Sequence, residues 1–116
     1  MSLGYESDIE RLLCKEVEKL GGRCVKWGVN GEPDRIVLLP GGLTVFVETK
    51  RADGKLSRLQ DEKIRRLKRL GYLVFVPYTK EGVKTIISVL KMLLEDEDED
   101  EASEEVSESG DRRSAE

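Results

Sequence analysis

Apolar residues recur at helical spacing in three parts of the chain. Residues 7–20 carry them at Ile9, Leu12, Leu13, Val17 and Leu20, and a glycine pair at 21–22 follows as a stop. Residues 57–70 repeat this spacing and end before Gly71, and a third such stretch runs from Thr79 to Leu94. The pattern predicts three amphipathic helices.

Four shorter segments have the alternation or the apolar run that is typical of strands: residues 23–29, 34–39, 44–50 and 72–77. The glycine-containing stretch 40–43 joins the second and third of them as a turn. In such a hairpin Leu39 would face Thr44, and Asp34 would lie near residues 48–50. The order αβββαβα predicts an α/β domain with a mixed central sheet flanked by helices.

The charges divide the chain into two parts. Residues 95–116 contain twelve acidic and two basic side chains, a net −10, whereas residues 1–94 contain twelve acidic and eighteen basic, a net +6. A run of like charges repels itself and has no apolar face to bury, so we expect a folded domain over 1–94 and a disordered acidic tail over 95–116. The basic domain favours a polyanionic partner, although many soluble domains carry such a surplus as a solvated surface.

The chain has two cysteines, Cys14 and Cys24, whose spacing matches no zinc or redox signature. We expect both to be reduced core residues of an intracellular protein. Histidine is absent from the sequence, which excludes mechanisms built on a histidine base and leaves carboxylates, lysine, tyrosine or a metal for any catalysis. No stretch approaches the ~20 apolar residues of a membrane span, so no membrane partner is expected.

Opposite charges interrupt the third predicted strand at Glu48 and Lys50. Because side chains alternate along a strand, both project from one face, which is compatible with a surface ion pair worth under about 1 kcal/mol. The predicted hairpin also brings Asp34 close, and two carboxylates at short range repel each other unless a cation lies between them. A divalent ion beside a lysine fits the hydrolysis of a phosphodiester.

The segments "GEPDRIVLLPGG", "VFVETK" and "GKLSRLQ", in this order and spacing, resemble the VRR-NUC (virus-type replication-repair nuclease) domain of the PD-(D/E)XK nuclease superfamily. The similarity spans about residues 6–78 and includes the lead-in "ESDIERLLCKEVEKLGG". It implies a restriction-endonuclease-like core, a Mg²⁺ or Mn²⁺ cofactor and a DNA substrate. For a lone-domain member it also implies a homodimer that cuts four-way (Holliday) junctions.

The resemblance carries over to individual residues. It implies metal binding by Asp34, Glu48 and the carbonyl of Thr49, and it implies that Lys50 is the catalytic lysine. Gln60 matches the glutamine that family members place beside the site on the next helix. Glu10 matches the first-helix glutamate that often completes the metal shell, and Glu6 is a weaker candidate for that role.

Two of these residues have structural alternatives. The stretch from Ser57 to Gln60 is also a capping box, in which the glutamine would bond back to the start of its helix, and the stretch from Ser7 to Glu10 repeats that motif. Capping and a role in the site both stay open for Gln60 and Glu10.

Basic residues gather on the segment that leaves the predicted site. The candidate DNA-binding residues are Arg51, Lys55, Arg58, Arg65 and Arg69. Helix pairs such as Asp61 with Arg65 and Glu62 with Arg66 would neutralise only part of this charge. Aromatic residues make up 5% of the chain and no base-reading motif is evident, so we expect recognition of DNA backbone and shape.

The sequence therefore favours a Mg²⁺- or Mn²⁺-dependent, structure-selective DNA endonuclease, acting inside the host cell if it is virus-encoded. A catalytically idle DNA-binding module of a replication or repair assembly is the alternative. In a third hypothesis the acidic tail is the functional part and binds a basic partner or its own domain.

Overall fold

The structure, a computed structural model, describes the backbone of residues 5–107 and the side chains of residues 5–96. Its elements are α1 (Glu6–Lys19), β1 (Arg23–Lys26), β2 (Arg35–Leu38), the 3-10 turn η1 (Pro40–Gly42), β3 (Thr44–Val47), α2 (Arg58–Arg69), β4 (Leu73–Phe75) and α3 (Lys80–Ser107). The predicted order αβββαβα is confirmed.

The sheet is mixed, as predicted, and its strand order is β1-β2-β3-β4. β1, β2 and β3 are antiparallel neighbours, whereas β4 pairs with β3 in the parallel direction. Parallel strands need a crossover connection, and α2 lies in that connection. β4 is left at an edge of the sheet.

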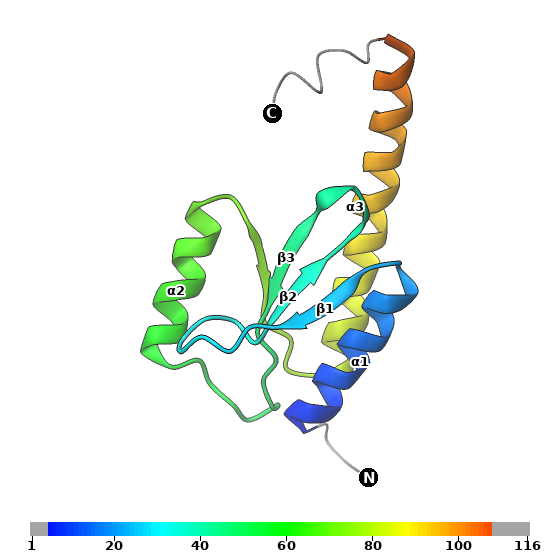
Figure 1. Ribbon diagram of the computed structural model, residues 1–116. Helices are drawn as coiled ribbons and strands as arrows, with labels where there is room; N and C mark the ends of the chain where they lie inside the picture. The colour runs from blue at the N-terminus through cyan, green and yellow to red at the C-terminus, as the bar shows by residue number, and fades with distance from the viewer. Residues whose placement is uncertain (1–4, 108–116) are drawn as a thin grey trace.

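Helices cover both faces of the sheet, with α1 and α3 on one face and α2 on the other (Figure 1). The larger apolar core lies on the side of α1 and α3 and includes Ile9, Leu13, Val37, Val45, Val83 and Leu90. The smaller core lies under α2 and contains Phe46, Ile64 and Val74, with Trp27 stacked against Phe46 at a ring-centroid distance of 5.3 Å. Leu59 and Leu70 are exposed rather than part of this core.

The hairpin register differs by one residue from the register expected from the sequence. Leu38, and not Leu39, faces Thr44. The turn is longer because the amide of Leu39 donates to the carbonyl of Leu43 at 2.9 Å, and Gly41 and Gly42 inside it adopt φ of +79° and +82°. Glycine tolerates such angles, so the sequence "PGG" closes this hairpin with a 3-10 turn.

The helix starts also differ from one another. Ser57 caps α2 in a complete capping box with Gln60, which confirms the capping alternative for this segment. α1 starts one residue before Ser7, with Tyr5 as its N-cap and no side-chain capping bond, so the proposed Ser7–Glu10 capping box is wrong. At α3 the amide of Gly82 donates to the hydroxyl of Thr79 at 3.0 Å.

α3 continues past the core into the acidic segment, for which the disorder expected from residue 95 stays a prediction. Leu93 and Leu94 are the last α3 residues that pack against the core, but the helical backbone extends to Ser107 (Figure 1). A strongly acidic sequence can remain helical when an amphipathic segment already fixes its first turns. The remainder of the predicted tail, residues 108–116, lies outside the described residues. None of the helices in the described part of the chain is long and apolar enough to cross a bilayer.

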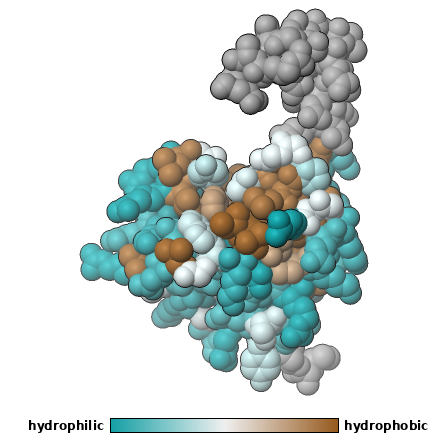
Figure 2. Space-filling view, viewed as in Figure 1, coloured by the Kyte–Doolittle hydropathy of each residue, from teal (hydrophilic) through white to brown (hydrophobic). Residues whose placement is uncertain are grey.

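One face of the molecule carries an apolar patch between α2 and α3, surrounded by hydrophilic surface (Figure 2). The exposed apolar residues at and just before β4 are Leu70, Tyr72 and Leu73. Apolar side chains therefore reach the surface beside the edge strand β4, as Leu38 of β2 also does.

Candidate active site

The candidate site lies where β3 ends and its chain continues beside β4. The amide of Glu48 donates to the carbonyl of Phe75 at 2.9 Å, and the amide of Lys50 donates to the carbonyl of Pro77 at 3.0 Å. These bonds extend the parallel ladder beyond Val47 and fix the backbone of residues 48–50. The side chains of Glu48 and Thr49 are buried here, being 2% and 0% exposed.

Asp34 lies at the start of β2, and the structure brings it to these residues as predicted. Its backbone amide donates to Glu48 Oε1 at 3.1 Å, and its Oδ2 accepts a hydrogen bond from the hydroxyl of Thr49 at 3.1 Å. Lys50 Nζ lies 3.3 Å from Glu48 Oε2. Glu48 and Lys50 thus form an ion pair, but a largely buried one instead of the exposed surface pair considered from the sequence.

Gln60 makes both of the contacts considered for it, one in the capping box and one with the candidate site. Its Oε1 accepts from the amide of Ser57 at 2.9 Å, which completes the capping box of α2. Its Nε2 donates to Glu48 Oε2 at 3.0 Å. The first turn of α2 is therefore tied directly to the buried carboxylate, and a residue that the sequence pattern could assign only to one role or the other bridges both.

The environment of Glu48 disfavours its charged form. Burial raises the pKa of the Glu48 carboxyl above its ordinary value, and the nearby charge of Asp34 raises it further, while Lys50 acts in the opposite direction. A single lysine thus compensates the two carboxylates only in part. A cation between them would relieve both effects.

The backbone beside these carboxylates offers a further oxygen. The β2–β3 register, continued for two residues past its last pair, places Pro33 opposite Thr49. Hydrogen-bonded pairs alternate along an antiparallel ladder, and Leu39–Leu43 is one of them, so Pro33 and Thr49 fall in the hydrogen-bonded set. Proline has no N–H to donate. The Thr49 carbonyl therefore receives no ladder bond from this partner and can serve as a ligand.

The residues present fit a small divalent cation of the magnesium type. Such an ion needs only one or two carboxylates and takes carbonyls, waters or phosphate oxygens for its other positions. Asp34, Glu48 and the Thr49 carbonyl supply that set. Within the described residues no group of three or more acidic, cysteine or histidine side chains is close enough to hold a metal by itself.

Glu10 is not brought to this cluster, which differs from the role implied for it. Its Oε2 accepts a hydrogen bond from Arg35 Nε at 2.6 Å, and the two side chains are 19% and 20% exposed. Glu6 is exposed in the first turn of α1. Arg35 also donates to the carbonyl of Cys24 at 3.2 Å. Sequence reasoning overlooked Arg35, although its place directly after Asp34 puts it on the opposite face of β2, toward α1.

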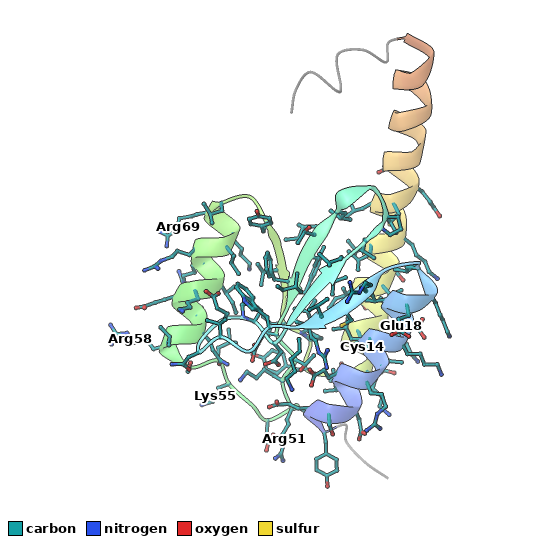
Figure 3. The ribbon with its side chains drawn as sticks, viewed as in Figure 1. Cys14, Glu18, Arg51, Lys55, Arg58 and Arg69 are labelled. Carbon is teal, nitrogen blue, oxygen red and sulfur yellow. The ribbon has the colours of Figure 1, made fainter. Side chains whose placement is uncertain are left out.

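The predicted DNA-binding residues follow α2 and the loop before it, and Figure 3 shows Arg58 and Arg69 near the two ends of this helix. Three of the five make ion pairs: Arg51 with Asp53 at 3.3 Å, Arg58 with Glu62 at 3.9 Å and Arg65 with Asp61 at 2.9 Å. The pair with Glu62 involves Arg58 instead of the expected Arg66. Among the described residues Lys55 and Arg69 make no ion pair.

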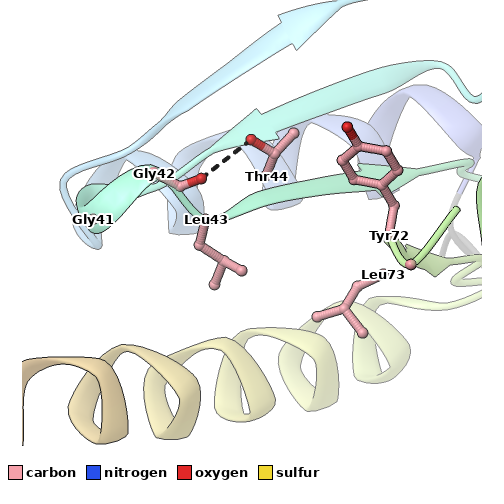
Figure 4. A pocket seen from close by; sticks show the side chains of 7 residues that line it. Gly41, Gly42, Leu43, Thr44, Tyr72 and Leu73 are labelled. Atoms are coloured by element: carbon pink, nitrogen blue, oxygen red, sulfur yellow. Dashed lines mark hydrogen bonds between the residues drawn. The ribbon is translucent and has the colours of Figure 1, made fainter. Parts of the chain in front are cut away.

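Two other features lie apart from these groups. Cys14 and Cys24 are free and half-buried, in agreement with the expectation of reduced cysteines, and burial together with a hydrogen bond to Cys14 raises the pKa of Cys24. A hollow of about 400 Å³ lies at the other end of β3, between the η1 turn and Tyr72 and Leu73 (Figure 4). It contains no acidic or basic side chain, so we assign it no chemistry.

Comparison with known proteins gives two similarities. A sequence described as "Putative nuclease p44" from Acyrthosiphon pisum secondary endosymbiont phage 1 is 42% identical over 79 residues, which cover 66% of this chain and 85% of that protein. A solved structure described as "VRR_NUC domain" superposes with a TM-score of 0.67 at 31% sequence identity, covering 72% of this chain and 94% of the other. No family model matches the sequence.

Proposed function

Since the chain belongs to the VRR-NUC family of nucleases, we propose that it is a metal-dependent DNA endonuclease that selects branched DNA, four-way junctions in particular. The observation that carries this proposal is the group of Asp34, Glu48 and Lys50, joined by direct contacts at the end of β3, with Glu48 buried and the other two partly buried. Two carboxylates and one lysine in a buried position have no packing role that apolar residues would not fill at lower cost.

The proposed chemistry is hydrolysis of a phosphodiester. When bound by Asp34, Glu48 and the Thr49 carbonyl, Mg²⁺ or Mn²⁺ supplies charge neutralisation and polarises the phosphate. Lys50 places its ammonium at the same point and offsets the negative charge that develops on the phosphate. Its hydrogens can also hold the attacking water in line. Thr49 and Gln60 orient the two carboxylates by the hydrogen bonds that they donate.

Selection of branched DNA is supported by what surrounds the site. The charged surface on α2 and the preceding loop presents arginines and lysines, which bind phosphates without reading bases. A homodimer fits the twofold symmetry of a four-way junction. The apolar residues Leu70, Tyr72 and Leu73 at the exposed edge of the sheet provide a surface of the kind that subunits bury.

The test is cleavage of a panel of labelled DNAs, comprising a four-way junction, a flap and a linear duplex, with Mg²⁺, Mn²⁺ or EDTA. We expect junction cleavage only with the divalent ion, and its loss in Asp34→Asn, Glu48→Gln and Lys50→Ala with junction binding retained. Glu18→Gln, which removes an exposed α1 carboxylate, is the matched control and should cleave normally.

Cleavage in EDTA, or by Glu48→Gln, would remove the metal mechanism. Binding without cleavage under every condition would favour the idle DNA-binding module. Sedimentation of the same samples tests the dimer, and a monomer that cuts all duplexes equally contradicts both the dimer and the junction selectivity.

A further inference from the structure

A second basic surface lies on the other side of the sheet from α2, in the groove between α1 and α3. A pocket of about 210 Å³ is lined there by Asp8, Arg11, Leu12, Lys15 and Lys80. Three of these side chains are basic and one is acidic, a net +2. Within the described part of the chain, Asp8 pairs only with Arg11, at 3.6 Å, and Lys15 and Lys80 make no ion pair.

Both walls of this groove are attached to the candidate active site. Lys80 follows Pro77 by three residues, and the carbonyl of Pro77 accepts the hydrogen bond from the amide of Lys50. Three extended residues span at most roughly 10 Å. On the other wall, Glu10 of α1 binds Arg35, the residue directly after Asp34. The groove therefore opens near the same end of the sheet as the reacting groups.

The two basic surfaces differ in how much of their charge is already neutralised. On α2 and its loop three of the five candidate residues (Arg51, Arg58 and Arg65) have acidic partners, whereas in the groove one of three (Arg11) does. Lys15 and Lys80 are exposed and, like Lys55 and Arg69, have no acidic partner in the part of the chain described by the structure. Exposed lysines without partners bind phosphate at the lowest cost, because no ion pair has to be broken first. The amides of the first turn of α3 add to the positive potential at Lys80.

From this arrangement we propose that the α1–α3 groove, through Arg11, Lys15 and Lys80, binds the DNA backbone on the side of the cleaved phosphodiester opposite to α2. The proposal rests on the proposed function, since it names a further part of the substrate for the same site. Lys80 lies at most roughly 10 Å along the chain from Pro77. At a phosphate spacing of about 3.4 Å per strand along the duplex, it meets phosphates roughly three nucleotides from the cleaved one. The substrate then crosses the end of the sheet and contacts both helical layers.

The experiment measures the salt dependence of junction binding in EDTA, in which no cleavage is expected. The test variant is Lys15→Ala/Lys80→Ala. The control is Lys19→Ala/Lys91→Ala, which removes the same charge from the far part of the same two helices. Circular dichroism on both confirms that the helices are intact.

Each lysine that contacts a phosphate adds about 0.9 to the slope of log Kd against log salt. We therefore expect the slope of the test variant to fall by about 2 and its affinity near 0.1 M salt to fall by about tenfold or more, while the control stays close to the unmodified protein. Equal slopes for the two variants would overturn the groove proposal. If the unmodified protein itself fails to bind any DNA, the proposed function fails instead, so the two failures are distinguishable.

Discussion

Replacing Glu10 by glutamine separates the two roles that this residue could have. If Glu10 completes a metal shell, Glu10→Gln abolishes cleavage and leaves stability nearly unchanged. If its partner is Arg35, as the structure shows, the same change weakens the attachment of α1 to the sheet. We expect the second outcome, with the loss appearing in the free energy of unfolding.

The magnitude follows from the geometry of the pair. Glu10 Oε2 and Arg35 Nε are 2.6 Å apart, and about a fifth of each side chain is exposed. Two unit charges 4 Å apart attract by about 4 kcal/mol at an effective dielectric constant of 20, and the desolvation of both groups offsets part of that. Exposed pairs are worth up to about 1 kcal/mol, and loss of one member of a fully buried pair costs about 3–5 kcal/mol. For this half-buried pair we expect a loss of about 2 kcal/mol.

Urea denaturation measures the loss in the free energy of unfolding. In a domain of this size, a loss of about 2 kcal/mol should lower the melting temperature by roughly 8–16 °C. Glu16→Gln is the matched control, because its 3.2 Å pair with Lys19 lies on the same helix but with the lysine 61% exposed. We expect less than about 0.5 kcal/mol there. A double-mutant cycle of Glu10→Gln with Arg35→Gln should give a coupling of about 1–2 kcal/mol.

Cleavage by folded Glu10→Gln should remain within a few-fold of the unmodified enzyme. The reasoning is refuted if Glu10→Gln keeps full stability, shows no coupling to Arg35 and loses cleavage. That combination of results would support the role in metal binding that the family resemblance implies for Glu10.

Three further outcomes are expected. Gly22→Ala places a Cβ 2.6 Å from a backbone carbonyl oxygen of β2 and should cost about 2 kcal/mol or more in urea denaturation, whereas Gly28→Ala, with no atom within 4 Å, should be close to neutral. Burial raises the pKa of Glu48, so the unfolded chain releases this proton at the lower pH. In EDTA the unmodified protein should then lose stability relative to Glu48→Gln as pH rises from 4 to 7, and a constant difference would contradict this. The raised pKa of Cys24 leaves little thiolate, so iodoacetamide should alkylate it more slowly than an unfolded-peptide thiol at pH 8, and an equal rate would show that the thiol is not shielded.

The sequence predicted the elements well because each has a local cause. Helical apolar spacing, glycine stops and alternating strands sufficed for the order of elements and the mixed sheet, and the hairpin brought Asp34 to Glu48. The register was wrong by one because the spacing of apolar residues does not reveal that Pro40–Gly42 forms a 3-10 turn. The disorder expected from residue 95 stays a prediction, and charge composition alone does not reveal that the α3 backbone extends to Ser107.

The candidate site was less predictable where it depends on contacts between distant elements. Glu10 pairs with Arg35 across 25 positions of the sequence, and no local pattern indicates that partner. The basic groove was missed for the same reason, because Lys15 and Lys80 come together only when α3 packs against α1. Gln60 could be recognised from the sequence because it belongs to a local motif, the capping box with Ser57. The same side chain also makes a distant contact, with Glu48.

Pro33 gives the site a property that its ligands alone do not explain. This buried proline has no N–H to donate to the carbonyl of Thr49, so the β2–β3 ladder ends at the pair Arg35–Val47. The Thr49 carbonyl is left without a donor from the neighbouring strand. A buried acceptor without a donor costs about 1–3 kcal/mol. Under the proposed chemistry, the cation that satisfies this carbonyl also removes that cost, so ion binding and folding are thermodynamically linked. If the proposed chemistry holds, we expect the ion-free protein to be the less stable form.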